Sequence, residues 1–165
     1  GISSPLIAHW PAGIPAARRN TLEPQPSHLI DLMATLLDVA GAPYPAEYRG
    51  ERLIPLEGVS LVPAFSGRAL GRKQPIFWEH EGNRAVRDGR WKLVAKGATG
   101  PWELYDIGAD RTETHDLAAQ EPARVRDLAA AWENWARRAQ VIPWIWGPPH
   151  GAPKAGKGKQ QSPGG

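Results

Sequence analysis

Three side chains suited to binding an anion lie close together at residues 79–84, in the segment EHEGNR. A protonated imidazole and a guanidinium donate charge-assisted hydrogen bonds to anionic oxygens, and an amide adds a neutral donor. We therefore consider His80, Asn83 and Arg84 candidate substrate-binding residues. A structural interpretation is also open, in which His80 bonds a neighbouring carboxylate and Arg84 ties the sheet together through a carboxylate.

The candidate residues lie where the chain is predicted to turn between two strands. Residues 74–95 alternate like two or three antiparallel strands, and the candidates fall at the first turn. The second turn is predicted at Asp88-Gly89, the dipeptide that most readily supplies positive φ at both central positions of a type I′ turn. This turn would pair Val86 with Trp91. By alternation, one mostly apolar face comprises Arg84, Val86, Trp91 and Leu93.

The residues that follow extend this sheet and supply a helix to cover it. WELYD at residues 102–106 alternates as a further strand, which predicts an antiparallel meander of about four strands. A helix is predicted from Pro122, because proline suits a first turn and apolar residues then recur every three or four positions. This stripe comprises Val125, Leu128, Ala129, Trp132, Trp135 and Ala136. Residues 74–146 should therefore form a small subdomain of four antiparallel strands packed by a C-terminal helix.

The first part of the chain has a different pattern, in which an apolar run precedes a helix. Pro5–Trp10 is compatible with a strand buried on both faces, of the kind found in parallel sheets. A helix is predicted over residues 27–40, with Ser27 as its N-cap and Gly41 as its C-terminal stop. Its predicted buried stripe comprises Leu29, Met33, Leu36, Leu37 and Ala40. Most of residues 42–73 is predicted to be loop.

The charge pattern argues against a polyanionic partner. The formal net charge is +3, and three lysines lie in residues 147–165, which are rich in Pro and Gly and predicted to be a disordered basic tail. Without these lysines, basic and acidic residues would balance, so no basic stripe for nucleic acid is expected. No apolar run is long enough to predict a membrane-spanning helix. The absence of cysteine excludes disulfides and thiolate metal sites within this chain.

Other residues that could bind a ligand have simpler structural explanations. His9 lies in the predicted buried strand and is expected to be a core histidine, whereas His28 is expected to cap or pack the helix start. Exposed tryptophans can stack on sugars, but only Trp144 and Trp146, after the last helix, could be exposed, and these two could instead seal the end of the domain. The tryptophans predicted to lie in the core are Trp91, Trp102, Trp132 and Trp135.

Several motifs occur in a fixed order along residues 1–146. They are the apolar entry at residues 1–11, then IDLMATLLDVAG, EGVSLVPAFSG, NRAVRDGRWKLV and WELYDI, and finally Asp110, Glu113 and Asp116-Leu117-Ala118. In this order they closely resemble the C-terminal half of type I sulfatases. The chain differs from the usual pattern at Ser3, where the family often has Arg, and at Ala34, where Pro is usual.

The resemblance implies an α/β fold, namely the C-terminal part of an alkaline-phosphatase-like sulfatase, with residues 1–73 ending the large domain. It also implies hydrolysis of a sulfate ester by a formylglycine nucleophile assisted by a calcium ion. Formylglycine is formed from Cys or Ser in a motif with Pro and Arg, but the only partial match, Ser3-Ser4-Pro5, has Ile7 where Arg is required. We therefore expect no catalytic residue and no metal ligand in this chain, and both to lie upstream.

Two functions from different classes remain open at this point. The first is a sulfatase portion that acts on a small-molecule or carbohydrate sulfate ester, together with the N-terminal catalytic half of the same protein. Its location would be periplasmic or extracellular, as is usual for the family. The second is a noncatalytic α+β module that binds a sugar or an anion through its Trp and Arg residues. A formylglycine motif in frame before Gly1 would favour the first.

Overall fold

The contacts of the chain divide it into two compact units. The structure, a computed structural model, describes residues 3–142, and its units are Gly1–Gln74 (unit 1) and Pro75–Gly165 (unit 2). The tail predicted at residues 147–165, and Trp144 and Trp146 before it, lie outside the described residues. Within residues 3–142, every helix is too short or too polar to cross a membrane.

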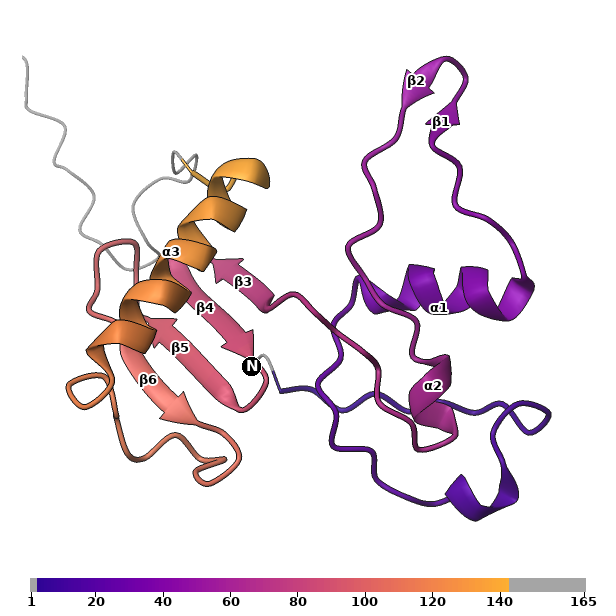
Figure 1. Cartoon of the computed structure of the whole chain (residues 1–165), viewed down its shortest axis with the longest axis horizontal. Helices are drawn as coiled ribbons and strands as arrows, with labels where there is room; N and C mark the ends of the chain where they lie inside the picture. Colours follow the sequence, from indigo (N-terminus) through magenta and orange to yellow (C-terminus); the bar gives the residue numbers. More distant parts are fainter. Residues whose placement is uncertain (1–2, 143–165) are drawn as a thin grey trace, which may run out of the picture. The chain divides into compact units, whose positions relative to one another are not determined.

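Unit 2 is built around a four-stranded antiparallel sheet in the order β3-β4-β5-β6 (Figure 1). The strands are β3 (Ile76–His80), β4 (Asn83–Asp88), β5 (Trp91–Ala95) and β6 (Glu103–Asp106). Each strand pairs with the next one along the chain, since short connections suffice to join antiparallel neighbours. The predicted four-stranded meander is confirmed.

The turn between β4 and β5 lies one residue later than the sequence predicted. Val86 pairs with Leu93 rather than with Trp91, so the two central turn residues are Gly89 and Arg90. Gly89 has a φ of 55°, whereas Arg90 is not among the described residues with positive φ. This is the pattern of a type II′ turn, so the predicted type I′ turn is wrong. Because the pairing shifts by two residues, the predicted faces of both strands are unchanged.

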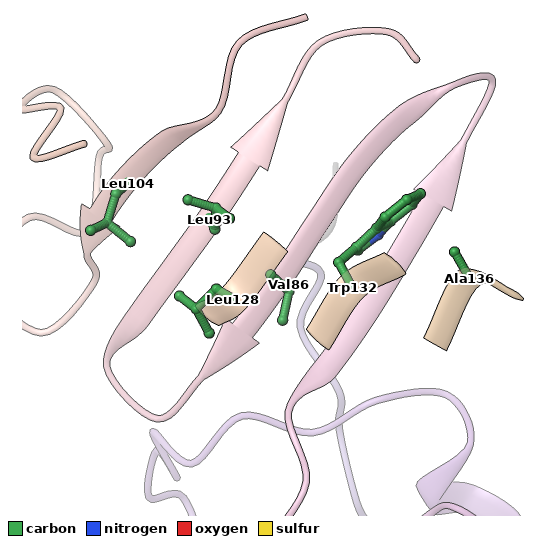
Figure 2. Close-up of a cluster of buried hydrophobic side chains, with 6 residues drawn as sticks. All are labelled: Val86, Leu93, Leu104, Leu128, Trp132 and Ala136. Carbon is green, nitrogen blue, oxygen red and sulfur yellow. The ribbon is translucent and has the colours of Figure 1, made fainter. Parts of the chain in front are cut away.

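Helix α3 (Pro122–Arg138) lies across one face of this sheet (Figure 1) and buries the predicted apolar stripe against it. The spacing of four residues places the three most buried side chains of α3 on one side of the helix. Figure 2 shows the resulting core: Val86, Leu93 and Leu104 from the sheet, with Leu128, Trp132 and Ala136 from α3. Trp91, Trp102 and Trp135 pack against this cluster, so the predicted placement of the four tryptophans is confirmed.

Unit 1 consists of short elements joined by long connections. Its elements are η1 (Ala16–Arg18), α1 (Asp31–Ala40), β1 (Glu47–Tyr48), β2 (Glu51–Arg52) and α2 (Val62–Phe65). The β1–β2 hairpin and α2 interrupt a region that was predicted to be mostly loop. Among the described residues of unit 1, the buried apolar side chains are Leu61 and Ala64, whereas unit 2 has a continuous core.

The strand predicted at Pro5–Trp10 is wrong, because the structure has no strand there. A strand requires a neighbour to satisfy its backbone groups, and none of the described strands pairs with this segment. Ile7 is 89% exposed, and His9, expected in the core, is exposed as well. The apolar composition of the segment is therefore not sufficient to form a strand without a partner.

The predicted N-cap of α1 is also wrong, because the helix begins at Asp31 rather than next to Ser27. The turn before the helix is closed by the Asp31 carboxylate, whose Oδ2 accepts a hydrogen bond from the His28 N–H at 2.7 Å. The Ile30 N–H donates to His28 Nδ1 at 3.4 Å within this turn, but the N-cap position is occupied by Ile30, so His28 does not cap the helix. The predicted stop at Gly41 is confirmed.

The face of α1 that was predicted to be buried is largely exposed in this chain. Leu29, Met33 and Leu36 are 77%, 53% and 65% exposed, respectively. The buried residues of the helix are instead the polar Asp31 and Thr35. The spacing correctly indicated an apolar stripe, but the helix packs against the rest of unit 1 through the opposite side, which carries Asp31 and Thr35.

Candidate functional site

The β3–β4 hairpin carries the candidate substrate-binding residues at its tip. His80 and Asn83 form the last pair of the ladder, and Glu81 and Gly82 between them have φ values of 51° and 85°. Positive φ at both central positions is the pattern of a type I′ turn, which is favoured here because its twist matches that of the strands. The turn is further held by the Gly82 N–H, which donates to Glu79 Oε1 at 2.8 Å.

The hairpin tip is fastened to the loop between β5 and β6. Asn83 makes this connection through Oδ1, which accepts from the Gly97 N–H at 3.0 Å, while its Nδ2 donates to the His80 carbonyl within the hairpin at 2.9 Å. Gly82 is buried at this contact, where a Cβ would lie 3.2 Å from the Ala98 backbone nitrogen. The amide of Asn83 therefore organises two loops of unit 2.

Arg84 is half-buried on the face that α3 covers. Its Nε donates to the Gly97 carbonyl at 3.2 Å, and one terminal nitrogen donates to the Gly100 carbonyl at 2.7 Å. The guanidinium carbon lies 4.3 Å from the Trp102 ring centroid, within the range of a cation–π contact. Burial lowers the pKa of Arg84, while the nearby Glu133 acts in the opposite direction. The hydrogen-bond partners of Arg84 are thus backbone carbonyls, whereas the structural interpretation of the sequence predicts a carboxylate partner.

His80 differs from the other two candidates because its side chain is exposed at the end of β3. The imidazole forms no hydrogen bond or ion pair with any residue in the range 3–142, whereas Asn83 and Arg84 use their polar groups within unit 2. The structure thus brings the three predicted residues together at one hairpin. Of the three, His80 is the one whose side chain forms no hydrogen bond or ion pair within the described residues.

The acidic residues between β6 and α3 order the backbone of this connection. Asp110 Oδ2 accepts from the N–H groups of Thr114 and His115 at 2.7 and 2.8 Å, and these bonds lower the pKa of Asp110. Asp116 Oδ1 accepts from the N–H of Leu104 at 2.9 Å. Within residues 3–142, no group of three or more His, Cys, Asp or Glu side chains is arranged to hold a metal ion.

Asp31 is a buried charged residue that the sequence analysis did not single out. Its carboxylate is fully buried, accepts from the Val59 N–H at 2.9 Å and forms an ion pair with Arg72. Burial alone would raise the pKa of Asp31, but the hydrogen bond from Arg72 and two backbone N–H groups outweigh it, so the pKa is lowered. The sequence signal that could have identified Asp31 is its position, since an Asp in the first turn of a helix interacts favourably with the helix N-terminus. Its partner 41 residues away was not predictable from local pattern.

The family to which the chain belongs is shown by its match to a known domain. Residues 1–134 match the family model described as N-sulphoglucosamine sulphohydrolase, C-terminal. The chain belongs to this family, and it is a C-terminal portion of the type I sulfatase fold. The predicted fold class, an α/β alkaline-phosphatase-like sulfatase with a four-stranded antiparallel sheet and a packed helix, is confirmed.

Individual relatives agree with this family. The chain is 28% identical over 148 residues to an uncharacterized sulfatase of Schizosaccharomyces pombe. The aligned region covers 86% of this chain and 26% of that protein. It is 32% identical to N-acetylgalactosamine-6-sulfatase of Canis lupus familiaris over 67% of this chain and 19% of that protein. The chain therefore spans about a quarter or less of these two relatives.

A solved structure shows the same fold in three dimensions. The crystal structure of Ps i-CgsB superimposes with a TM-score of 0.61 and 28% identity, covering 78% of this chain and 27% of that chain. Ps i-CgsB has also been solved in complex with k-i-k-neocarrahexaose. The shared fold thus extends over most of this chain but over only about a quarter of the larger protein.

Proposed function

We propose that this chain is the C-terminal portion of a sulfatase that hydrolyses sulfate esters, where it completes the fold and forms one wall of the substrate cleft. The observation that carries this proposal is the family match over residues 1–134. The relatives named as sulfatases support it, since their additional length provides room for a catalytic part before the matched region. The partner of this chain is therefore the N-terminal catalytic half of the same polypeptide.

The formylglycine nucleophile and calcium ion of such an enzyme would belong to that catalytic half. When bound, calcium would stabilise the charge on the sulfuryl oxygens during attack on sulfur. The residues of this chain do not fit either group. The chain has no cysteine, its partial serine motif Ser3-Ser4-Pro5 has Ile7 where Arg is required, and residues 3–142 contain no suitable cluster of metal ligands. We assign no catalytic step to this chain.

Within the cleft, we assign substrate contact to His80. Its exposed ring at the hairpin tip can donate a charge-assisted hydrogen bond to a sulfate or sugar oxygen when protonated. Asn83 and Arg84 would support this contact by fixing the tip on the β5–β6 loop. A sulfated carbohydrate is the proposed substrate class, in line with the oligosaccharide bound to Ps i-CgsB.

The proposal is tested by comparing the 165-residue chain with the complete polypeptide that contains it. Hydrolysis of nitrophenyl sulfate and release of sulfate from a sulfated oligosaccharide are measured for both. We expect turnover by the complete polypeptide and none by the chain alone. Turnover by the isolated chain, or a complete polypeptide that binds sulfated sugars without hydrolysing them, would contradict the proposal. The second result would favour a noncatalytic sugar-binding module.

A further inference from the structure

The β1–β2 hairpin projects from unit 1 on the two chain segments that lead into it and out of it (Figure 1). Two hydrogen bonds join these segments: the Leu53 N–H donates to the Ala46 carbonyl at 3.0 Å, and the Tyr44 hydroxyl donates to the Ile54 carbonyl at 3.0 Å. Every residue from 47 to 52 is exposed. The hairpin is therefore an ordered arm whose own side chains all face solvent.

The tip of this hairpin has a backbone conformation that its sequence does not favour. The central turn residues, Arg49 and Gly50, have φ values of 53° and 85°, which is the pattern of a type I′ turn. Glycine adopts positive φ readily, whereas arginine seldom does, and asparagine is the residue preferred at the first central position. Strained positions of this kind cluster at functional sites. The strain at Arg49 therefore points to a use for its side chain.

The hairpin tip combines an aromatic ring with charged groups of both signs. Tyr48 is 57% exposed, and the guanidinium carbon of Arg49 lies 5.2 Å from its ring centroid. Within residues 3–142, the guanidinium groups of Arg49 and Arg52 form no hydrogen bond or ion pair, although Glu47 lies opposite Arg52 in the ladder. These charges are thus not used to hold the hairpin together.

We propose that the tip of the β1–β2 hairpin binds a sugar unit of the sulfated carbohydrate, in addition to the contact assigned to His80. This inference rests on the proposed function. Tyr48 stacks on the apolar face of the sugar ring, and Arg49 donates charge-assisted hydrogen bonds to a sulfate group. The carboxylates of Glu47 and Glu51 accept hydrogen bonds from sugar hydroxyls.

The charge and size of the tip favour this ligand over others. Nucleic acids and anionic lipid surfaces present negative charge throughout, and the two glutamates within residues 47–52 offset the two arginines that would attract them. A protein partner requires about 20 to 30 residues on each side of a stable interface, far more than this tip provides. An unsulfated sugar would leave the guanidinium groups without an anion. A sulfated sugar offers both sulfate oxygens and hydroxyl donors, so it matches both kinds of charged side chain.

The test uses the complete polypeptide with substitutions at the hairpin tip. Arg49→Asn removes the guanidinium and places the preferred Asn-Gly dipeptide in the turn, so the hairpin stays folded. Tyr48→Ala removes the ring, and Tyr48→Phe, which keeps it, is the matched control. Hexasaccharides of chondroitin sulfate, heparin and κ-carrageenan, each before and after desulfation, serve as probes. Their dissociation constants are measured by calorimetry, and KM and kcat are measured for each sulfated hexasaccharide and for nitrophenyl sulfate.

We expect Arg49→Asn and Tyr48→Ala each to weaken binding of a sulfated hexasaccharide about tenfold and to raise its KM by a similar factor. Tyr48→Phe should bind like the wild type. Nitrophenyl sulfate has no sugar to place on the hairpin, so its kinetics should be unchanged in all variants. Desulfation should weaken binding less in Arg49→Asn than in the wild type, because the cation that meets the sulfate is already absent.

Two results would overturn the inference: dissociation constants that are unchanged in both Arg49→Asn and Tyr48→Ala, and the absence of binding to all three sulfated hexasaccharides. An equal effect of desulfation in Arg49→Asn and in the wild type would show that Arg49 does not meet the sulfate. Binding that depends on the hairpin without any hydrolysis would contradict only the proposed function. Hydrolysis of the hexasaccharides with unchanged binding in both variants would contradict only the inference.

Discussion

At the scale of single residues, Arg84 combines a buried cation with carbonyl partners from a neighbouring loop. Its two hydrogen bonds reach Gly97 and Gly100, and its guanidinium lies against Trp102. Arg remains charged even when it is partly buried, so these are charge-assisted contacts. Removing the side chain leaves two carbonyls and an aromatic face without their partner. Arg84 thus links the sheet, the β5–β6 loop and the core.

Replacing Arg84 with methionine should therefore destabilise unit 2. The Arg84→Met variant loses two hydrogen bonds to a charged group and two cation–π contacts, with Trp102 and Trp132, so we expect a cost of about 2 to 4 kcal/mol in the free energy of unfolding. Chemical denaturation followed by tryptophan fluorescence measures it. Arg126→Met, at an exposed position of α3, is the control. Equal costs for the two variants would mean that the contacts of Arg84 contribute little.

His80 should affect binding of substrate rather than folding. In the complete polypeptide, His80→Ala removes one charge-assisted hydrogen bond, so we expect kcat/KM to fall by about 10- to 100-fold, with Tm unchanged. The matched control is His115→Ala, since the His115 side chain is 82% exposed in another loop of unit 2. A lower Tm with unchanged kinetics would show that His80 only holds the hairpin together.

At the scale of secondary-structure elements, the start of α1 depends on one buried carboxylate. Asp31→Asn keeps the shape of the side chain but leaves the Arg72 guanidinium, whose side chain is 14% exposed, without its charge partner. Breaking a buried ion pair costs about 3 to 5 kcal/mol, so we expect rapid hydrogen exchange at the Val59 amide. Asp38→Asn, which changes an exposed acceptor, is the control. Comparable exchange in both variants would contradict the role of Asp31.

The same carboxylate should make unit 1 sensitive to acid. The pKa of Asp31 in the folded chain lies below its ordinary value of 3.8. The ion pair therefore contributes its full stability above pH 3.8, and this contribution is lost as the pH falls from 3.8 through the lower pKa of the folded chain. Protection of the Val59 amide should therefore decrease below that pH in the wild type, and much less in Asp31→Asn. Parallel pH profiles for the two proteins would contradict this assignment.

The β4–β5 turn depends on Gly89 for a conformational reason alone. A Cβ at this position would meet no atom within 4 Å, but the φ of 55° is strongly disfavoured for a β-branched residue. Gly89→Val should therefore destabilise unit 2 by roughly 1 to 3 kcal/mol, the cost of a strained backbone position. Thermal unfolding measures it, with the exposed Lys96→Ala as control. A shift in Tm no larger than that of the control would mean that the turn tolerates the strain.

At the scale of the whole molecule, the two units differ in how much apolar surface they bury. Unit 2 has a core shared by three strands and α3, whereas the buried apolar side chains among the described residues of unit 1 are Leu61 and Ala64, and α1 is joined to residues 59–61 by hydrogen bonds. Buried apolar contacts contribute most of the stability of a fold, and segments with few such contacts open more easily. The units should therefore respond differently when the chain is studied without its proposed partner.

Hydrogen exchange of the 165-residue chain should show this difference. We expect the amides of Val86 and Leu93 to be protected as long as unit 2 is folded, and those of α1 to exchange much faster. In the complete polypeptide, the amides of α1 should gain protection, since the proposed catalytic half would cover the exposed side chains of Leu29, Met33 and Leu36. Equal protection of α1 and the β4–β5 strands in the isolated chain would contradict this prediction.

Local sequence patterns were sufficient to predict the elements of unit 2 and the hairpin that carries the candidate residues. Strand alternation, turn residues and the stripe of α3 are local signals, and they were sufficient because the strands pair with their neighbours in sequence. They also placed His80, Asn83 and Arg84 at one hairpin tip.

The partners of the polar residues and the buried side of α1, in contrast, depend on contacts between segments that are distant in the sequence. Asp31 meets Arg72 across 41 residues, and Arg84 meets two carbonyls of a loop, and neither contact leaves a periodic trace in the sequence. An apolar stripe at helical spacing indicates that a surface will be covered, but it does not specify by what. The strand predicted at Pro5–Trp10 was wrong for the same physical reason: pairing depends on a neighbour that local pattern does not supply.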